Sequence, residues 1–253
     1  MSADSIVLKT DSSVENHTGI RIRPYYEHAG ITIYHGDCRD VLPLLPKVDL
    51  VLTDPPYGVG FQYASHDDSL ESWRRLMQMV VVWTRAGGAS MLITPSCQIQ
   101  QLEWIYRTIP PDWLICWYKG SPGTAAFVGF NDWEPLLVYG KPKGLQMHDY
   151  FYAQPDPFTN GHPCPKPERW ATWLIGRASQ TLGIILDPFM GSGTTLVAAK
   201  QLGRRAIGIE IEERYCEIAA KRLSQEVFDW EIPQTTEGDP DEGDNLFSTL
   251  ESA

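Results

Sequence analysis

Apolar residues follow two alternating patterns along most of this chain. Short runs rich in β-branched and aromatic residues predict seven strands, at residues 31–37, 48–54, 89–94, 112–119, 134–141, 183–187 and 205–210. Helical spacing predicts the segments between them, at residues 39–45, 68–85, 96–107, 167–179, from about 193, and 212–223. Strands that alternate with helices are typical of a mostly parallel sheet covered on both faces, so the pattern predicts an α/β fold.

Three stretches lack both patterns. Residues 1–24 have no period and are predicted to be flexible, with order beginning near Tyr25. Residues 141–167 are rich in proline, aromatic residues and histidine and predict a long loop, and the shorter stretch 120–129 predicts another. Residues 226–253 have the acidic, Pro- and Gly-punctuated composition of a disordered tail. We therefore predict one domain, residues 25–225, between a flexible N-terminus and an acidic tail.

The net charge bears on possible partners, and its distribution along the chain matters more than its total. A formal charge of −11 disfavours a nucleic-acid ligand, because phosphates bind to clustered Lys and Arg. Nine of the acids lie in residues 226–253, which contain no Lys or Arg, so residues 1–225 carry a net charge of −2. Nucleic acid therefore stays a candidate partner. The tail is either a solubilising segment or a mimic of DNA that competes for a basic groove.

Composition excludes several other classes. No run approaches 18 apolar residues and the first residues lack the pattern of a signal peptide, so we expect a cytoplasmic protein with no membrane partner. The five cysteines are scattered and form no C-x-x-C pair, which argues against a zinc site and against a disulfide framework. We expect reduced thiols and no bound metal.

Two predicted strands end in an acid that is followed by an unusual turn. Asp54 precedes Pro55, Pro56 and Tyr57, and Asp187 precedes a glycine-rich turn that opens a helix. Open α/β sheets bind ligands at the carboxyl ends of their strands. A dinucleotide motif would need glycine where Leu196 stands, and a phosphate-binding loop would need a lysine after its last glycine.

The next predicted strand also ends in an acid. Glu210 is placed to accept hydrogen bonds from the hydroxyl groups of a ribose. The glycine turn lets backbone approach a ligand closely, yet neither phosphate-binding pattern is complete. An adenosine-containing cofactor without a pyrophosphate fits these features.

Several stretches of the sequence resemble the motifs of a known family. The stretches "TDPPYG" (53–58) and "DPFMGSGTT" (187–195) resemble the D-P-P-Y and D-P-F-x-G-x-G motifs of the amino-group DNA methyltransferases that use S-adenosylmethionine. Supporting motifs are "HGDCRDVL", "HPCPKP" and "GIEIEERYCEIAAKRL", so the resemblance covers about residues 31–224. The catalytic motif precedes the cofactor motif, as in the circularly permuted β class. The resemblance implies a Rossmann-like methyltransferase fold with a mostly parallel, seven-stranded sheet.

The resemblance also implies which residues form the site. The catalytic residues would be Asp54, Pro55, Pro56 and Tyr57. Asp37 would contact the adenine amino group of the cofactor beside the backbone of Cys38, and Lys166 and Pro167 would close over its methionine end. The remaining cofactor-binding residues would be Asp187, Pro188, Phe189, Gly191, Ser192, Gly193, Thr194 and Glu210.

The chemistry of methyl transfer to an amino group fits the catalytic motif. An exocyclic amine is a poor nucleophile because its lone pair is delocalised into the base. Asp54 and the carbonyl of Pro55 can each accept a hydrogen bond from this amine and draw the lone pair back to nitrogen, in line with the methyl group. Tyr57 offers a face on which a base turned out of the duplex can stack. No covalent enzyme intermediate is needed.

The expected function is thus methylation of DNA. The acid at the first motif position favours N6 of adenine, and N4 of cytosine is the alternative. A catalytically inactive nucleic-acid-binding or regulatory module with the same fold is the alternative of another class. No nuclease motif is found, which favours a stand-alone modification enzyme.

The candidate target-recognition loop, residues 141–165, is short. It predicts a short or relaxed target, or help from a second subunit in a homodimer. Lys141, Lys143, Arg169 and Arg177 are candidate phosphate contacts, and Tyr150, Phe151 and Tyr152 are candidate base contacts.

Overall fold

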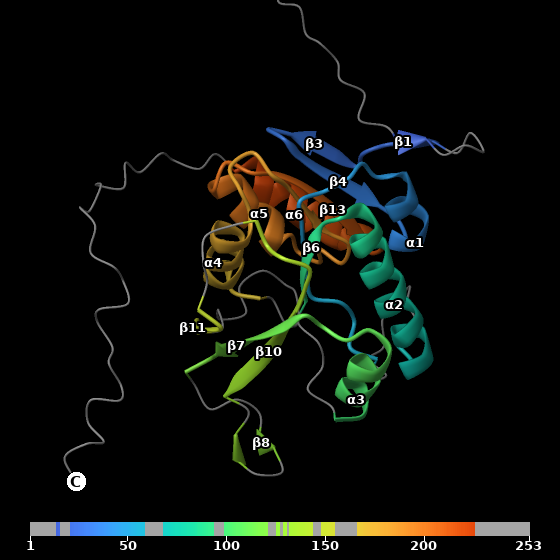
Figure 1. The fold of residues 1–253 in the computed structure, drawn as a ribbon. Helices are drawn as coiled ribbons and strands as arrows, with labels where there is room; N and C mark the ends of the chain where they lie inside the picture. Colours follow the sequence, from blue (N-terminus) through green and yellow to red (C-terminus); the bar gives the residue numbers. More distant parts are fainter. Residues whose placement is uncertain are drawn as a thin grey trace, which may run out of the picture.

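The computed structural model describes residues 14–15, 21–58, 68–93, 99–120, 125–126, 129–130, 132–143, 148–154 and 166–225. Nine strands in this part of the chain form one sheet in the order β11-β7-β10-β6-β5-β12-β13-β4-β3 (Figure 1). In chain order they are β3 (Tyr26–His28), β4 (Ile31–His35), β5 (Leu50–Thr53), β6 (Ser90–Ile93), β7 (Trp113–Tyr118), β10 (Trp133–Tyr139), β11 (Tyr150–Tyr152), β12 (Ile184–Asp187) and β13 (Arg205–Glu210).

The middle of the sheet is parallel. Strands β6, β5, β12, β13 and β4 all run in one direction, whereas β10 is antiparallel to both of its neighbours. Residues Ile33, Leu50, Leu52 and Ile185 of these strands have no exposed surface. Continuous burial along a strand is typical of a parallel sheet covered on both faces, as the sequence predicts.

Helices cover both faces of the sheet (Figure 1). Helices α4 (Glu168–Ala178), α5 (Thr194–Gln201) and α6 (Glu213–Ser224) contribute to one apolar cluster, with Trp170, Leu196 and Cys216 fully or almost fully buried. Helices α1 (Cys38–Val41), α2 (Leu70–Gly87) and α3 (Ile99–Thr108), with the 3-10 turn η1 (Leu42–Leu44), contribute to the second cluster. The sheet therefore lies between two layers of helices, which is a three-layer α/β arrangement.

Helix α2 shows how local sequence sets these elements. The Ser69 hydroxyl accepts a hydrogen bond from the Ser72 amide at 3.3 Å, which caps the first turn. Gly88 ends the helix in the left-handed region at φ 73°. Between these caps, Trp73, Met77, Val80 and other apolar residues at helical spacing face the core.

The number of strands differs from the prediction of seven. Seven strands of the sheet have four or more residues, and the three-residue strands β3 and β11 extend its edges. Strand β11 lies in the predicted long loop and pairs in parallel with β7. Three residues are too few to show a periodic pattern, so only tertiary pairing reveals such a strand.

Two short hairpin-like pairs also fall in predicted irregular segments. They are β1 (Val14–Glu15) with β2 (Arg21–Ile22), and β8 (Ala125–Ala126) with β9 (Gly129–Phe130). The acidic tail 226–253 and most of the predicted target-recognition loop lie outside the described residues. The boundaries of the predicted domain therefore stay a prediction.

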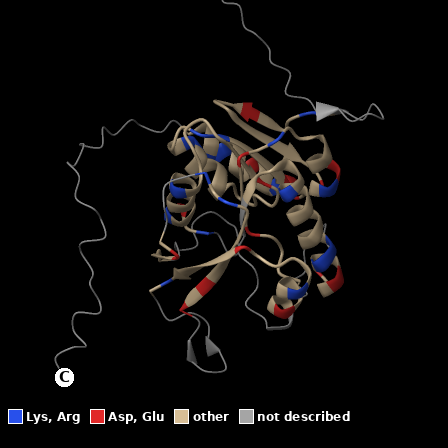
Figure 2. Cartoon of the chain, in the orientation of Figure 1, with Lys and Arg blue, Asp and Glu red and all other residues tan. Residues whose placement is uncertain are grey.

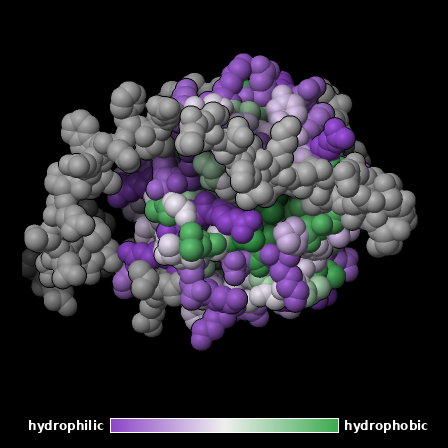
Figure 3. Space-filling model, turned by 90° about the horizontal axis from the view of Figure 1, so that it is seen from above, coloured by the Kyte–Doolittle hydropathy of each residue, from purple (hydrophilic) through white to green (hydrophobic). Residues whose placement is uncertain are grey.

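The surface of the described part carries mixed charge. Lys and Arg are spread over helices on both sides of the sheet, with Asp and Glu among them (Figure 2). Seen from above, hydrophilic and apolar surface lie side by side, with apolar groups near the centre (Figure 3). None of the described helices is long and apolar enough to cross a membrane.

Candidate active site

The two acidic strand ends lie next to each other. Strands β5 and β12 pair in parallel, with Val51 opposite Leu186, so both chains leave the sheet at its carboxyl edge. The hydroxyl of Thr53 donates to the Asp187 carboxylate at 2.7 Å, and both side chains are buried. One residue beyond Thr53 the chain reaches Asp54. The topology therefore joins the predicted catalytic motif to the predicted cofactor loop.

A pocket of about 430 Å³ opens at this edge. Its volume lies in the range of about 300–1,000 Å³ that is usual for small-molecule sites. All four predicted catalytic residues line it, Asp54, Pro55, Pro56 and Tyr57. Ten of the predicted cofactor-binding residues line it as well, namely Asp37, Cys38, Lys166, Asp187, Pro188, Phe189, Gly191, Ser192, Thr194 and Glu210.

The other two predicted residues are the N-caps of helices that start next to pocket residues. Gly193 is the N-cap of α5 at φ 83°, and a Cβ atom there would lie 2.8 Å from the Cβ of Ala219. Glycine is thus required by close packing of α5 against α6. Pro167 is the N-cap of α4. Neither residue lines the pocket.

Backbone amides hold the acid of the cofactor half. The Glu210 carboxylate accepts hydrogen bonds from the amides of Gly191 at 3.0 Å and Glu212 at 2.8 Å. Burial raises the pKa of Glu210, and these two amides oppose the rise. Each oxygen keeps a lone pair that can accept from a ligand hydroxyl. The acid therefore keeps the acceptors that the predicted contact with a ribose requires.

An arginine that sequence reasoning missed supports the glycine loop. The Arg222 guanidinium on α6 donates to the Ser192 carbonyl at 2.7 Å and to the Glu168 carboxylate at 2.6 Å. Its side chain is largely buried. Its place in "AAKRL" looks like that of any charged helix residue, so the sequence gives no signal for this contact.

The D-P-P-Y turn is held in one shape. The Tyr57 hydroxyl donates to Asp54 at 2.7 Å, and the amide of Gly58 donates to the buried carboxylate of Asp68 at 2.7 Å. Gln101 donates to the carbonyl of Tyr57. Gly58 has φ 65°, and a Cβ atom there would lie 2.7 Å from the Cβ of Trp73. The turn therefore needs glycine after its tyrosine.

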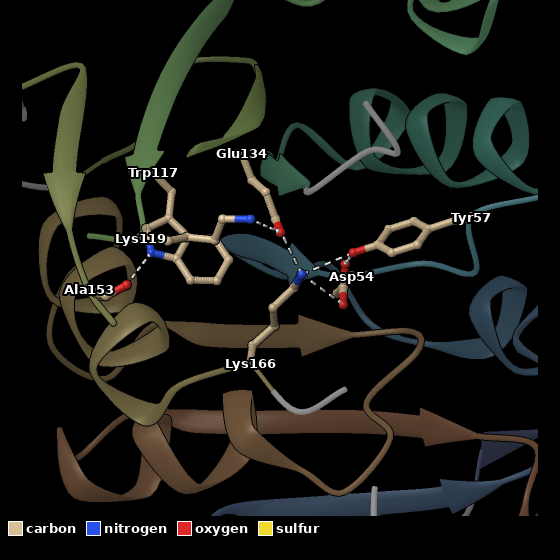
Figure 4. A network of polar contacts seen from close by, with 7 residues as sticks. All are labelled: Asp54, Tyr57, Trp117, Lys119, Glu134, Ala153 and Lys166. Atoms are coloured by element: carbon tan, nitrogen blue, oxygen red, sulfur yellow. Dashed lines mark hydrogen bonds and ion pairs between the residues drawn. The ribbon is translucent and has the colours of Figure 1, made fainter. Parts of the chain in front are cut away.

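Lys166 reaches the catalytic motif (Figure 4). Its Nζ atom donates to the Tyr57 hydroxyl at 2.9 Å and lies 3.4 Å from a carboxylate oxygen of Asp54. It also donates to Glu134 of β10 at 3.1 Å, and the second oxygen of Glu134 lies 3.3 Å from Nζ of Lys119. Sequence reasoning missed Glu134 and Lys119. A single acid inside the apolar run "WEPLLVY" is the signal that marks Glu134.

Burial and charge act in opposite directions on these groups. Burial raises the pKa of Asp54, and the Lys166 ammonium and the Tyr57 hydroxyl oppose this rise. Burial opposes the charged form of Lys166, but the nearby Asp54 carboxylate raises the pKa of Lys166 well above its ordinary value. Burial likewise opposes the charged form of Glu134, but the nearby Lys166 and Lys119 ammonium groups lower the pKa of Glu134. Burial raises the pKa of Asp187 to about 6.

Two candidate DNA contacts from the predicted loop do not face this edge. Phe151 is buried, with its ring stacked on that of Trp173 at 4.5 Å, so the predicted base contact is wrong for this residue. Lys143 follows β10, which is antiparallel and carries the chain to the opposite edge, where Lys143 lies 3.9 Å from Asp49. No group of three or more metal-ligating side chains occurs among the described residues.

Comparisons with known proteins agree with this geometry. The family model described as "DNA methylase" matches residues 113–221. Type II methyltransferase M.ScaI of Streptomyces caespitosus is 30% identical over 259 aligned positions, covering 81% of this chain and 84% of the relative. DNA adenine methyltransferase YhdJ of Escherichia coli (strain K12) is 27% identical over 246 positions, covering 76% and 82%.

Solved structures share the fold. The M1.HpyAVI–SAM complex matches with a TM-score of 0.59 and 26% identity, over 77% of this chain and all of that one. The cytosine-N4-specific PvuII DNA methyltransferase matches with a TM-score of 0.62 over 81% and 90%, and its 16% identity shows the fold alone. Fold and pocket thus define a Rossmann-like methyltransferase that uses S-adenosylmethionine. Within that class, the chain belongs to the type II DNA amino-methyltransferases of the N6/N4 family.

Proposed function

We propose that this protein transfers a methyl group to N6 of adenine in DNA, as a stand-alone modification enzyme. The observation that supports it most is that Asp54 and Asp187 lie at adjacent strand ends and line one pocket. The Escherichia coli relative carries the name of an adenine methyltransferase, and the motif has Asp at its first position. N4 of cytosine is the second candidate, because a fold relative is named for that base.

The catalytic turn supplies acceptors for the target amino group. Asp54 and the carbonyl of Pro55 each accept an N–H bond from this group, which localises the lone pair on nitrogen. Proline has no backbone N–H, so the turn presents no competing donor at Pro55 or Pro56. When bound, S-adenosylmethionine would supply an electrophilic methyl group and leave as the neutral thioether. The methylated nitrogen would lose one proton, for which the Asp54 carboxylate is an acceptor.

The residues that line the pocket would hold S-adenosylmethionine. Glu210 would accept hydrogen bonds from the ribose hydroxyls, and Asp37 with the backbone of Cys38 would contact the adenine end. The glycines of the turn from Asp187 to Thr194 would let the backbone approach the methionine end. Asp37 is held in place as the N-cap of α1 by the Arg39 amide at 2.8 Å. Lys166 and Pro167 are proposed to close over the methionine end of the cofactor. Lys166 would do so in addition to its contacts with Tyr57 and Glu134.

DNA approaches along the carboxyl edge, where exposed aromatic rings continue from the pocket. Trp133, Tyr118 and Tyr152 are direct neighbours across β10, β7 and β11, and each is close to half exposed. The rings of Tyr118 and Tyr152 lie 5.9 Å apart. Glu134 and Lys119 follow Trp133 and Tyr118 in the chain, so this row borders the catalytic network. Stacking of aromatic rings on bases contributes about 1–3 kcal/mol per base.

Residues 141–165 stay the candidate target-recognition loop, and a homodimer stays the candidate assembly that compensates for its short length.

Modification-sensitive sequencing of DNA from cells that express the protein tests the whole proposal, because it reports base, position and context together. Modified adenine in a defined context supports the proposal, and modified cytosine favours the second candidate. DNA without modification, from cells that contain folded protein, supports the inactive-module alternative.

The aromatic row has its own test. Replacing Tyr118 or Trp133 with alanine is expected to weaken binding of duplex DNA by about 5- to 160-fold for a ring that stacks on an unpaired base, as follows from the stacking energy. Binding of S-adenosylmethionine stays unchanged. Trp113 is exposed at the opposite end of β7 and serves as the matched control. Equal DNA affinity of all three variants and the native protein contradicts the placement of DNA on this edge.

A further inference from the structure

Four side chains of alternating charge form a series of ion pairs that begins at the catalytic turn (Figure 4). Asp54, Lys166, Glu134 and Lys119 are joined by ion pairs of 3.4, 3.1 and 3.3 Å. The exposed fractions of the Lys166 and Lys119 side chains are only 9% and 11%. The Asp54 and Glu134 side chains are 26% and 21% exposed. Removing four charged groups largely from water is unfavourable unless each is paired, and here the two acids balance the two lysines.

Aromatic rings restrict where the Lys166 ammonium can go. Its Nζ atom lies 5.4 Å from the ring centre of Trp117 and 5.7 Å from that of Tyr57. The Trp117 indole is fixed in turn, because it donates to the Ala153 carbonyl at 2.8 Å and lies nearly parallel to Phe151. The ammonium is therefore held between two rings and two carboxylates. A lysine whose only task was a loose contact with a ligand would not need this enclosure.

We propose that Lys166 is a positioning residue, whose ammonium keeps Asp54 in its carboxylate form and orients it toward the target amino group. Glu134, held by Lys119, fixes Lys166 from the other side. This inference rests on the proposed function of Asp54. Lys166, Glu134 and Lys119 thus act on the target amine indirectly, through Asp54 and Tyr57.

The chemistry explains why such a device is needed. A protonated Asp54 would present an O–H donor and lose the acceptor that the amine requires. Burial alone pushes Asp54 toward this protonated form, and a bound base removes further water from it. Among the described residues, Glu134 and Asp187 are the other acids around Asp54, and negative charge on either of them favours protonation too. The neutral Tyr57 hydroxyl donates to Asp54, and Lys166 is the cation that opposes the two acids.

The variants Lys166→Met and Glu134→Gln separate this role from a structural one. Removing the ammonium leaves Asp54 without a cation and near the negative charge of Glu134, which keeps only Lys119. The acidic limb of the single-turnover rate should therefore move up by about one pH unit or more, which slows transfer about tenfold on that limb. Removing the charge of Glu134 takes away a group that favours protonation of Asp54. Its acidic limb should not move up, although the rate falls because Lys166 loses its support.

Three further variants complete the set. Lys166→Arg keeps the charge and should return the limb toward its native position. Lys221→Met is the control, because Lys221 is 72% exposed and lies on the outer face of α6. Lys166→Gln removes the charge and retains a donor, and it replaces the Met variant if that one does not fold. The single-turnover rates are compared at saturating S-adenosylmethionine, because Lys166 is also proposed to close over the methionine end of the cofactor.

A direct titration makes the test independent of turnover. The ¹³Cγ shift of labelled Asp54, assigned by its loss in Asp54→Asn, should report a higher pKa in Lys166→Met than in the native protein. An unchanged pKa of Asp54 overturns the inference, even if the enzyme is active. A large loss of cofactor affinity with an unmoved limb overturns it in favour of a cofactor-binding role. A native protein that transfers no methyl group contradicts the proposed function, and the titration still decides this inference.

Discussion

The hydrogen bond from Thr53 to Asp187 connects the two halves of the site and can be tested by one substitution. The Thr53 side chain is fully buried and its hydroxyl lies 2.7 Å from the carboxylate. Thr53→Val keeps the shape and removes the donor. A hydrogen bond to a charged group contributes about 1.5–3 kcal/mol, and one to a neutral group about 0.5–1.5 kcal/mol. The effect should therefore depend on whether Asp187 is ionised.

The pKa of Asp187 sets the pH window. Because its pKa in the folded protein is raised from 3.8 to about 6, the stability linked to this group is present below pH 3.8 and lost as the pH rises through about 6. Losing the Thr53 donor raises this pKa further, so the variant should lose more stability at about pH 8 than at about pH 5. The expected difference is about 1 kcal/mol, within a total loss of about 1.5–3 kcal/mol at the higher pH.

Chemical denaturation at both pH values measures this difference. For a domain of this size the loss at high pH corresponds to a fall in Tm of about 3–12 °C. Thr84→Val is the matched control, because Thr84 is equally buried and its hydroxyl donates to the carbonyl of Val80 at 2.8 Å, which cannot ionise. Equal losses at both pH values for Thr53→Val would refute the reasoning about Asp187.

Three further predictions concern the turn, the glycine loop and the tail. Gly58→Ala should lower the free energy of unfolding by about 1–3 kcal/mol and the methyl-transfer rate with it, because alanine meets Trp73 and the left-handed backbone; a stable, fully active variant contradicts the geometry. Arg222→Met should weaken S-adenosylmethionine binding about tenfold in calorimetry, because Ser192 loses its charged partner, while unchanged affinity would show that the loop holds itself. Removing residues 226–253 should tighten DNA binding at low salt, and equal affinity of the two proteins would leave the tail as a solubilising segment.

Local sequence was sufficient for most of the sheet and for the pocket. The seven longer strands and the helices between them follow from apolar periodicity, because each buries enough surface to impose a pattern. The motif residues could be grouped in advance because carboxyl ends of parallel strands meet at one edge. Strand β11 was not predictable, since its pairing with β7 depends on a strand far away in the chain.

The contacts around Lys166 could not be predicted from the sequence. The motif places Lys166 in the pocket, yet its contact with Tyr57 spans 109 positions and its contact with Glu134 spans 32. Nothing in the spacing of these residues indicates that their charges alternate in space. Likewise, Phe151 and Tyr152 are adjacent aromatic residues, and only the register of β11 decides that Phe151 faces the core while Tyr152 faces outward.

The central claim is that Asp54 activates an adenine amino group for methylation. Purified protein, duplex DNA and S-adenosylmethionine with a deuterated methyl group are incubated, and the digested nucleosides are measured by mass spectrometry. We predict labelled N6-methyladenine with the native protein, and a loss of roughly 10²–10⁴-fold or more with Asp54→Ala, which still binds the cofactor. Label on cytosine, or equal label on adenine with Asp54→Ala, would contradict the account.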